Sequence, residues 1–378
     1  MLVLFPKKWR RLLRYLLFVP LIWILAMTLS AHSPNDGENF RRNLKQTTVT
    51  KEYSASSGIY EPSGGQGQSK FSVKKPSPTK VRNVDEKERL FYRHSDRVIN
   101  PHNFTYLINP GKCRTLGTID SPFLVIMVLA NAPDAEKRMT IRKTWGGASV
   151  TNNWPLRNIS RKVNVYFLHA KTDNRYWENQ LKDESAKYGD IIQEDFRESY
   201  RNLTLKSIMA LKWTSTFCHG ASYLMKVDDD VFVNTPYILD LLIAKNPSRH
   251  VIGLISPKSR VRRKGKWLTT VEEFPFDHFP PYTPGAGYLM SVPVAKDFYN
   301  TSQYVKPIWL EDVYITGILP KILGTVEHFG NDGFTDAMRK APKLCDVIRG
   351  EALTGTRMTQ DQLKQMWADM TNASKAIC

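Results

Sequence analysis

Three consecutive aspartates, Asp228, Asp229 and Asp230, stand in the otherwise largely apolar segment MKVDDDVFVN, residues 225–234. Neighbouring like charges repel, and removing them from water is costly unless a cation is present. Carboxylates two residues apart on an extended chain point the same way, whereas direct neighbours diverge. Asp228 and Asp230 therefore suit a hard divalent cation, which prefers oxygen ligands. A solvated acidic turn or a calcium-stabilised loop is the alternative.

A second acidic pair, Glu311 and Asp312, occurs in WLEDVYITGIL, residues 309–319, at the start of a predicted helix. A positioned carboxylate acts as a general base by taking the proton from an attacking hydroxyl. Acids in a first helical turn also interact favourably with the helix dipole without any catalytic role. The pair is therefore a candidate for proton transfer, with an N-terminal helix cap as the alternative.

The elements that must position these acids alternate along the chain. Apolar runs predict strands, and longer periodic segments predict helices. Strands are expected at 121–130, 162–170, 222–229, 251–255 and 288–292, and helices at 136–146, 203–218 and 313–323. Such alternation predicts an α/β sheet, and these sheets bind ligands beyond the carboxyl ends of their strands. The aspartate run stands where one predicted strand ends.

The N-terminal segment has the pattern of a signal anchor. Five cationic residues in 1–14 precede seventeen uncharged residues, 15–31. This predicts a cytosolic tail, a membrane-spanning helix and a lumenal body, with a cleaved signal peptide as the alternative. Residues 32–112 are polar and rich in turn-forming residues, which predicts a flexible stem. Residues 113–378 form the expected folded domain.

Glycosylation signals and cysteines favour a secretory compartment. Asn-x-Ser/Thr sequons occur at five positions, which are Asn103, Asn158, Asn202, Asn300 and Asn372. The sequence also has four cysteines, which are Cys113, Cys218, Cys345 and Cys378. None has zinc-site spacing, so two structural disulfides are expected in an oxidising lumen, with three pairings open.

The strong positive charge does not indicate nucleic-acid binding. The chain has a formal charge of +18, and residues 1–112 contribute 19 Lys/Arg against 8 Asp/Glu, or +11. The excess lies mainly before the folded domain, and no zinc-finger or RNA-recognition motif accompanies it. The basic run SRVRRKGKW, 259–267, suggests an anionic acceptor or a membrane surface. A solvated surface loop is the favoured interpretation of that run.

Taken together, the ordered motifs resemble those of the β1,3-glycosyltransferases, a family of β1,3-galactosyltransferases and β1,3-N-acetylglucosaminyltransferases. The resemblance covers about residues 113–378. One segment departs slightly, because Glu198 stands where the family usually has Asp. The segments that carry the resemblance are RMTIRKTWG (138–146), ESYRNLTLKS (198–207), MKVDDDVFVN (225–234), KWLTTVEEFPFDHFPPYTPGAGYLMS (266–291) and WLEDVYITGIL (309–319).

This resemblance implies a single catalytic domain of the glycosyltransferase-A (Rossmann-like) fold, a UDP-sugar donor, Mn²⁺ and inversion at the anomeric carbon. It implies Asp312 as the base, with Glu311 as the second choice, and Asp228 and Asp230 as metal ligands. Asp229 is expected to face elsewhere or to contact the ribose of the donor. Inversion needs only one protein carboxylate, which takes the proton of the acceptor hydroxyl.

Several further residues are candidates for substrate binding. Arg138 and Arg142 follow the first strand and are expected to meet the nucleotide phosphates, although a structural ion pair is equally open. Lys206 is expected to neutralise Asp228 or Asp229, with a solvated helix lysine as the alternative. Candidate acceptor-binding residues in PYTPGAGYLMS are Tyr282, Gly285, Gly287 and Tyr288. A tight turn entering a buried strand would also explain the two glycines.

One departure from the family pattern concerns the metal. Members usually have a His near the start of their final helix, where this chain has Thr356 or a neighbour. Weaker Mn²⁺ affinity, or an inactive homologue that binds glycans or a partner, therefore stays open, and a calcium-dependent lectin is a third class.

The favoured interpretation is a Golgi type II membrane enzyme that moves galactose from UDP-galactose to the 3-hydroxyl of a protein or lipid glycan. UDP-N-acetylglucosamine is the alternative donor. Expected protein partners are a second copy of the chain or other Golgi transferases.

Overall fold

The computed structural model describes residues 86–113, 121–336, 341–372 and 378, which belong to one compact unit. Within these ranges, no helix is long and apolar enough to cross a membrane. The expected cytosolic tail (1–14), signal anchor (15–31) and most of the stem lie outside the described residues. The functional argument therefore rests on the folded unit.

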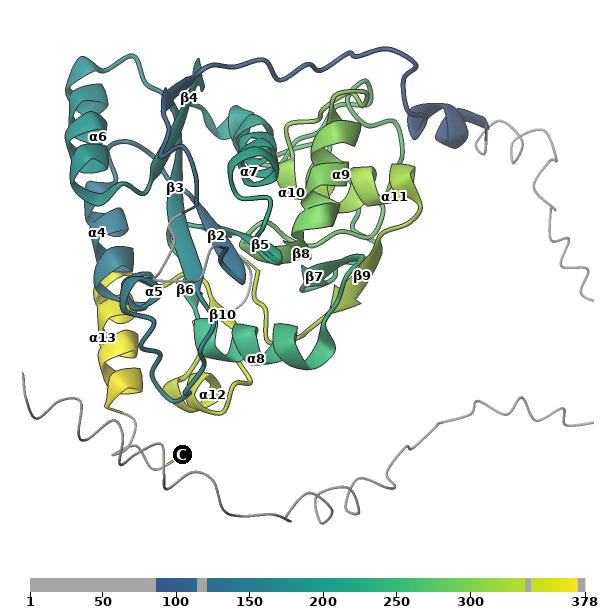
Figure 1. Ribbon diagram of the computed structural model, residues 1–378. Helices are drawn as coiled ribbons and strands as arrows, with labels where there is room; N and C mark the ends of the chain where they lie inside the picture. The colour runs from purple at the N-terminus through teal and green to yellow at the C-terminus, as the bar shows by residue number, and fades with distance from the viewer. Residues whose placement is uncertain (1–85, 114–120, 337–340, 373–377) are drawn as a thin grey trace, which may run out of the picture. The chain divides into compact units, whose positions relative to one another are not determined.

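An eight-stranded mixed sheet forms the centre of the described unit, with the order β1-β4-β3-β2-β5-β8-β7-β9 (Figure 1). Strands β4, β3, β2 and β5 are parallel, whereas β8 runs antiparallel to both of its neighbours. A separate two-stranded sheet pairs β6 with β10. The strands are β1 (Tyr106–Ile108), β2 (Leu124–Leu129), β3 (Val163–Lys171), β4 (Ile191–Arg197), β5 (Tyr223–Asp228), β6 (Phe232–Val233), β7 (His250–Gly253), β8 (Gly287–Ser291), β9 (Glu327–Gly330) and β10 (Thr354–Gly355).

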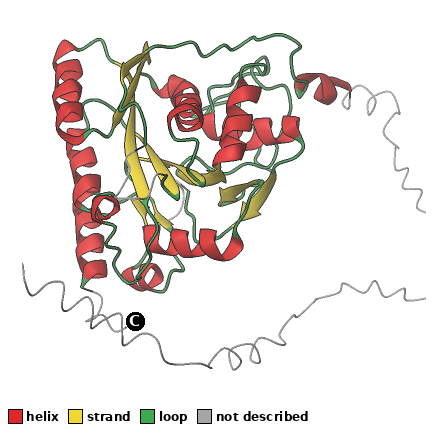
Figure 2. Cartoon of the chain, viewed as in Figure 1, coloured by secondary structure: helices red, strands yellow, loops and turns green. Residues whose placement is uncertain are grey.

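Helices cover both faces of the large sheet (Figures 1 and 2). The central strand β2 is buried at all six positions, as expected for a parallel strand covered on both sides. Its alternate residues join two different hydrophobic clusters, one containing Val125 and the other containing Leu124. The helices are α4 (Ala135–Lys143), α5 (Ala148–Thr151), α6 (Arg175–Tyr188), α7 (Leu203–Phe217), α8 (Thr235–Lys245), α9 (Val292–Ser302), α10 (Glu311–Val313), α11 (Leu319–Leu323), α12 (Leu344–Ile348) and α13 (Gln360–Thr371), with a 3-10 turn η1 (Tyr200–Asn202) and a π-helical turn η2 (Tyr314–Ile318).

Local sequence signals explain where several helices begin and end. Asn174 caps α6 by accepting a hydrogen bond from the Tyr176 amide, and Gly189 ends that helix in the left-handed conformation. Helix α13 begins with a capping box in which Thr359 and Gln362 exchange hydrogen bonds. These ends fix the lengths of two helices that flank the sheet.

The structure confirms the predicted α/β class and adds detail at both ends of the domain. Strand β1 lies inside the segment expected to be stem and pairs antiparallel with β4. The folded unit therefore begins before the expected boundary at residue 113. Two disulfides form, as expected, and they join Cys113 to Cys218 and Cys345 to Cys378.

The sequon asparagines lie at the surface of the described unit. Four of them are exposed, and these are Asn103, Asn158, Asn300 and Asn372. Asn202 is half-buried, and its side chain donates a 2.8 Å hydrogen bond to the Arg197 carbonyl. Oligosaccharyl attachment at four sites is therefore compatible with the fold as it stands.

Candidate active site

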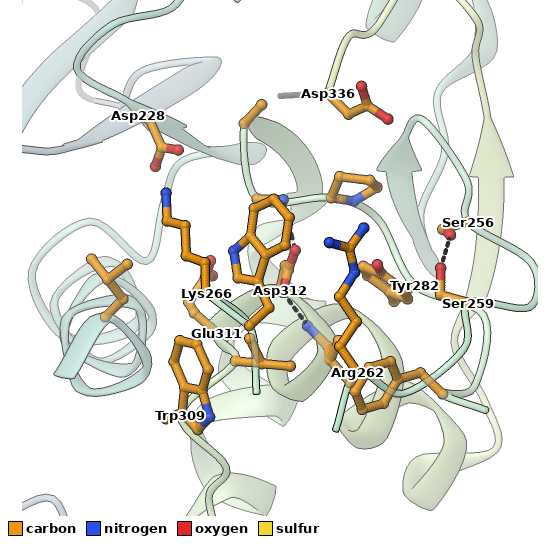
Figure 3. Close-up of a pocket in the computed structure, with 18 of the residues that line it drawn as sticks. Asp228, Ser256, Ser259, Arg262, Lys266, Tyr282, Trp309, Glu311, Asp312 and Asp336 are labelled. Atoms are coloured by element: carbon orange, nitrogen blue, oxygen red, sulfur yellow. Dashed lines mark hydrogen bonds between the residues drawn. The ribbon is translucent and has the colours of Figure 1, made fainter. Parts of the chain in front are cut away.

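A cavity of about 950 Å³ opens beyond the carboxyl end of β5. Strand β8 begins beside that end, because Val227 pairs with Gly287 in the antiparallel register. Helix α10 contributes the second acidic pair, and the loop of residues 256–267 forms another wall. Figure 3 shows acidic, basic and aromatic side chains from these segments facing one space. The cavity is therefore where the two acidic motifs of the sequence meet.

The three consecutive aspartates divide into two that face the cavity and one that faces away from it. Asp228 and Asp230 line the cavity, and Asp229 does not. Asp229 instead forms a 3.0 Å ion pair with Lys137 of α4. Burial raises the pKa of Asp229 to about 6, although Lys137 opposes that shift. Asp229 therefore lies outside the cavity lining, in agreement with the expectation that it faces elsewhere, and its contact with a ribose stays a prediction.

The cavity-facing carboxylates fit a hard divalent cation that keeps part of its coordination shell for other ligands. Burial and the nearby charge of Asp228 raise the pKa of Asp230, as expected where two acids share a site without a cation. No group of three His, Cys, Asp or Glu suited to a metal occurs in the described part of the chain. The protein would therefore supply two carboxylates, and water and phosphate oxygens would complete the shell.

Thr356 lies at the position where the family resemblance leads us to expect a histidine. It is buried, it lines the same cavity, and its hydroxyl donates a 2.7 Å hydrogen bond to the Asp336 carbonyl. His328 does not replace the missing imidazole, because it lies in β9, outside the cavity lining, 2.6 Å from the Thr316 carbonyl. Any metal here would be held without a histidine from either position.

Lys226 connects the two acidic motifs, and the sequence analysis did not single it out. Its Nζ lies 2.8 Å from Asp228 Oδ1 and 3.3 Å from Glu311 Oε2, and it donates to the Gly285 carbonyl. Burial alone would lower its pKa, but Asp228 and Glu311 hold the pKa above the ordinary value. The available signal was a lysine inside the buried strand sequence YLMKVD, since an unpaired lysine is rarely buried.

Glu311 is fully engaged inside the protein. One carboxylate oxygen accepts hydrogen bonds from Ser207 (2.8 Å) and Tyr288 (2.5 Å), and the other faces Lys226. The residue is 6% exposed. Glu311 lines the cavity, but both of its oxygens have partners within the protein, so the geometry favours Asp312 for proton transfer.

Asp312 is half-buried and lines the cavity, where its carboxylate is held by two backbone amides. Its Oδ1 accepts from Val313 N at 2.9 Å, and its Oδ2 accepts from Gly285 N at 3.2 Å. Burial, followed by the charge of Glu311, raises its pKa to about 6. A π-helical turn follows directly, a feature that often marks functional sites. Asp312 is thus a positioned carboxylate able to accept a proton near neutral pH.

The glycines and tyrosines just before and at the start of β8 divide between the cavity and the core. Gly285 and Tyr282 line the cavity. A Cβ on Gly285 would lie 3.2 Å from Glu311 Oε2, so the small residue lets the backbone approach the acidic pair. Tyr288 is 2% exposed and hydrogen-bonds Glu311, and Gly287 packs against Met225. Tyr288 and Gly287 therefore support the site from behind.

The two arginines expected to meet the nucleotide phosphates lie outside the cavity lining, and so does Lys206, which was expected to neutralise Asp228 or Asp229. Arg138 and Arg142 both bind Glu184, at 2.7 Å and 2.6 Å, and Arg142 also pairs with Asp190 at 2.8 Å. Lys206 is buried and pairs with Glu198 at 2.8 Å. The structure favours the alternative of internal ion pairs for the two arginines. Lys206 pairs directly with Glu198, and the charges of Asp229 and Asp228 also oppose the lowering of its pKa by burial.

The basic segment 259–267 is largely exposed, as expected for a surface loop, and it also borders the cavity. Four of its cationic residues line the cavity instead of forming only a solvated surface loop, and these are Arg260, Arg262, Lys264 and Lys266. Figure 3 shows Lys266 and Arg262 extending toward the space that Asp228 and Asp312 face. Two tryptophans that the sequence analysis passed over, Trp267 and Trp309, line the same space. Both tryptophans lie in irregular segments, so no helical or strand periodicity in the sequence marked them.

Comparison with known proteins gives the family. A sequence-family model described as Galactosyltransferase matches residues 136–328. The β-1,3-galactosyltransferase 1 of Homo sapiens is 34% identical over 300 residues, which cover 78% of this chain and 87% of that protein. The β-1,3-galactosyltransferase 5 of Mus musculus is 37% identical over 285 residues, which cover 73% and 89%.

A solved structure, the apo form of the bifunctional glycosyltransferase WbbM, covers 67% of this chain and 51% of its own. Its TM-score is 0.35 at 10% identity, too low to carry an argument. The family model spans more than half of the chain, and it includes the aspartate run and the Glu311–Asp312 pair. The relatives exceed 30% identity over more than two thirds of the chain. The chain belongs to the galactosyltransferase family.

Proposed function

We propose that this chain is an inverting β1,3-galactosyltransferase that moves galactose from UDP-galactose to the 3-hydroxyl of an acceptor sugar. The observation that carries the proposal is the position of Asp312, a carboxylate held by two amides in the cavity that Asp228 and Asp230 also line. The named relatives are β-1,3-galactosyltransferases, which favours galactose over N-acetylglucosamine as the transferred sugar.

The chemical step needs one base and one leaving group. Asp312 accepts the proton from the acceptor 3-hydroxyl. The oxygen of that hydroxyl forms a bond to the anomeric carbon of galactose at the same time. The bond from that carbon to the phosphate oxygen breaks on the opposite face, and UDP leaves with the electron pair. A base with a pKa near the working pH combines the correct ionisation state with useful basicity, and positioned bases typically contribute about 10²–10⁴-fold to a rate.

The remaining polar groups keep that base in place. Lys226 and the hydroxyls of Ser207 and Tyr288 hold Glu311 as a buried anion, and this anion helps to raise the pKa of Asp312. Asp228 and Asp230 would hold Mn²⁺, which when bound neutralises charge on the departing diphosphate. Tyr282 and Gly285 stand where the acceptor would approach Asp312.

We further propose that the enzyme is a Golgi type II membrane protein anchored by residues 15–31, with residues 32–112 largely as its stem. The exposed sequon asparagines and the two disulfides support a lumenal domain. Removal of N-glycans from the full chain made in a secretory host should lower its apparent mass. Resistance of the intact protein to a protease added outside sealed vesicles would place the domain in the lumen.

The activity is tested with the full chain in mild detergent, Mn²⁺ and a panel of UDP-sugars. We expect acceptor-dependent UDP release with UDP-galactose, at least about 10²-fold lower in Asp312→Asn, which removes the base. Omission of Mn²⁺ should abolish release if Asp228 and Asp230 bind the metal. Acceptor-dependent release that is unchanged in Asp312→Asn would overturn the assignment of the base, and preference for another donor would overturn galactose.

A further inference from the structure

The loop of residues 259–267 places a positive charge at every second position along one wall of the cavity. Arg260, Arg262, Lys264 and Lys266 are exposed and line the cavity. None of the four forms an ion pair with a carboxylate of the described residues. Five carboxylates from other segments line the same cavity, and these are Asp228, Asp230, Glu311, Asp312 and Asp336. The loop cations therefore form one wall of a cavity of mixed charge, where they can meet an anionic group of a substrate.

The loop that carries these charges is held firmly from within. The guanidinium of Arg263, which does not line the cavity, donates to the carbonyls of Thr269, Thr270 and Phe274 at 2.9 Å each and to that of Phe276 at 2.8 Å. The backbone of the loop also pairs with a neighbouring segment, for example from Val261 N to Asp277 O at 2.8 Å. The four cavity cations are therefore presented by an ordered wall.

Aromatic rings accompany the cations at this wall. Arg262 lies 4.7 Å from the ring centre of Trp267, and Lys266 lies within 5.5 Å of the same ring. Trp309 stands two residues before Glu311 and also lines the cavity. An indole offers a rigid, largely apolar surface with a polar edge, which suits packing against a sugar ring. A surface that has both cations and indoles is suited to bind a sugar that carries a negative charge.

The donor already has counter-charges elsewhere in the cavity. A divalent cation at Asp228 and Asp230 would offset part of the negative charge of these carboxylates and the diphosphate, and Lys226 is paired with Asp228 and Glu311. The exposed guanidinium of Arg357 adds a further cation, on a residue held at a left-handed φ of 58°. Strained backbone of this kind clusters at functional sites. The loop cations and Arg357 are therefore further positive charges in the cavity that an anionic group of a substrate can meet.

We propose that the acceptor is an anionic glycan, with a carboxylate or sulfate on the sugar that receives galactose, bound by Arg260, Arg262, Lys264 and Lys266. The inference rests on the proposed transferase function and adds the substrate class. Charge-assisted hydrogen bonds from guanidinium groups to such anions are short and geometrically specific. A membrane surface fits less well, because these side chains line a cavity.

The test uses matched neutral and anionic acceptors with the full chain. The pairs are phenyl β-glucoside with phenyl β-glucuronide, and phenyl β-galactoside and phenyl β-N-acetylglucosaminide each with its 6-sulfate. We expect kcat/KM to be at least about tenfold higher for the anionic member of a pair, as a charged hydrogen bond would give. Arg262→Gln/Lys264→Gln should abolish this preference, so that kcat/KM of the variant is the same for both members of a pair. Lys258→Gln, an exposed cation outside the cavity lining, is the matched control and should keep the preference.

The outcomes separate this proposal from the proposed function. Equal use of both members, or a double variant that raises the KM for UDP-galactose instead of the acceptor, would overturn the anionic acceptor while leaving the transferase intact. Absence of transfer to every acceptor would count against the proposed function. In that case, calorimetric binding of the same pairs decides the matter, since tighter binding of the anionic member, weakened by the double variant, supports the proposal and equal binding refutes it.

Discussion

Lys226 offers a quantitative test of how the two acidic motifs are held together. Its Nζ lies 3.3 Å from Glu311 Oε2, and the two side chains are 3% and 5% exposed. Charges at that distance attract by roughly 5 kcal/mol at an effective dielectric constant of about 20. The contact with Asp228 adds less, because that side chain is 43% exposed and solvent screens it. Lys226→Met therefore leaves Glu311 as a buried anion without a cation.

We expect Lys226→Met to lower the free energy of unfolding by about 3–5 kcal/mol, the usual cost of breaking a buried pair by removing one partner. Lys226→Met/Glu311→Gln should be at least about 1 kcal/mol more stable than the single variant, since it removes the stranded charge. Urea unfolding of the full chain, followed by tryptophan fluorescence, measures both quantities. A loss below about 1 kcal/mol, or no recovery in the double variant, would refute the reasoning.

Three further predictions concern the base, the disulfides and the internal arginine pairs. Asp312 must be ionised to accept a proton, and its pKa is raised to about 6, so kcat/KM should fall about tenfold per pH unit below that value. A pH profile in which kcat/KM begins to fall only near pH 4 would contradict this. Loss of the Cys113–Cys218 disulfide, which closes a loop of 105 residues, should lower the free energy of unfolding by about 4.8 kcal/mol. Loss of the Cys345–Cys378 disulfide, which closes a loop of 33 residues, should lower it by about 3.7 kcal/mol, because a shorter loop restricts the unfolded chain less. A larger loss for the shorter loop in urea unfolding would contradict this reasoning. Arg138→Met should lower the free energy of unfolding by about 3–5 kcal/mol, and the KM for UDP-galactose should stay within about twofold of wild type. A variant with unchanged stability and a higher KM for UDP-galactose would show instead that Arg138 binds the donor.

The sequence predicted the strands and helices whose patterns are strong. The continuous apolar run at 121–130 became β2, and the expected helix at 203–218 became α7 (Leu203–Phe217). Strand β4 and helix α6 were not predicted, although Asn174 and Gly189 mark the two ends of α6. The segment 313–323 was predicted as one helix, but its first part, Tyr314–Ile318, forms a π-helical turn, and no local pattern encodes that turn.

The candidate site was predictable where residue type and spacing carry the chemistry. The spacing of Asp228 and Asp230 anticipated that both face one cavity and that Asp229 faces away. Charge alone did not distinguish cations that line the cavity from cations in internal pairs. Arg142 meets Glu184 and Asp190, 42 and 48 residues away in sequence, so its role depends on tertiary contacts. The same holds for the loop cations, whose place in the cavity follows from the path of the loop.

The most direct test of inverting galactosyl transfer to a 3-hydroxyl is a proton NMR time course of the product made from UDP-galactose, in which galactose is α-linked. The account predicts that the first product to form carries a β-linked galactose, with a large H1–H2 coupling, attached at carbon 3 of the acceptor. An α-linked product, or attachment at another carbon, would contradict the account.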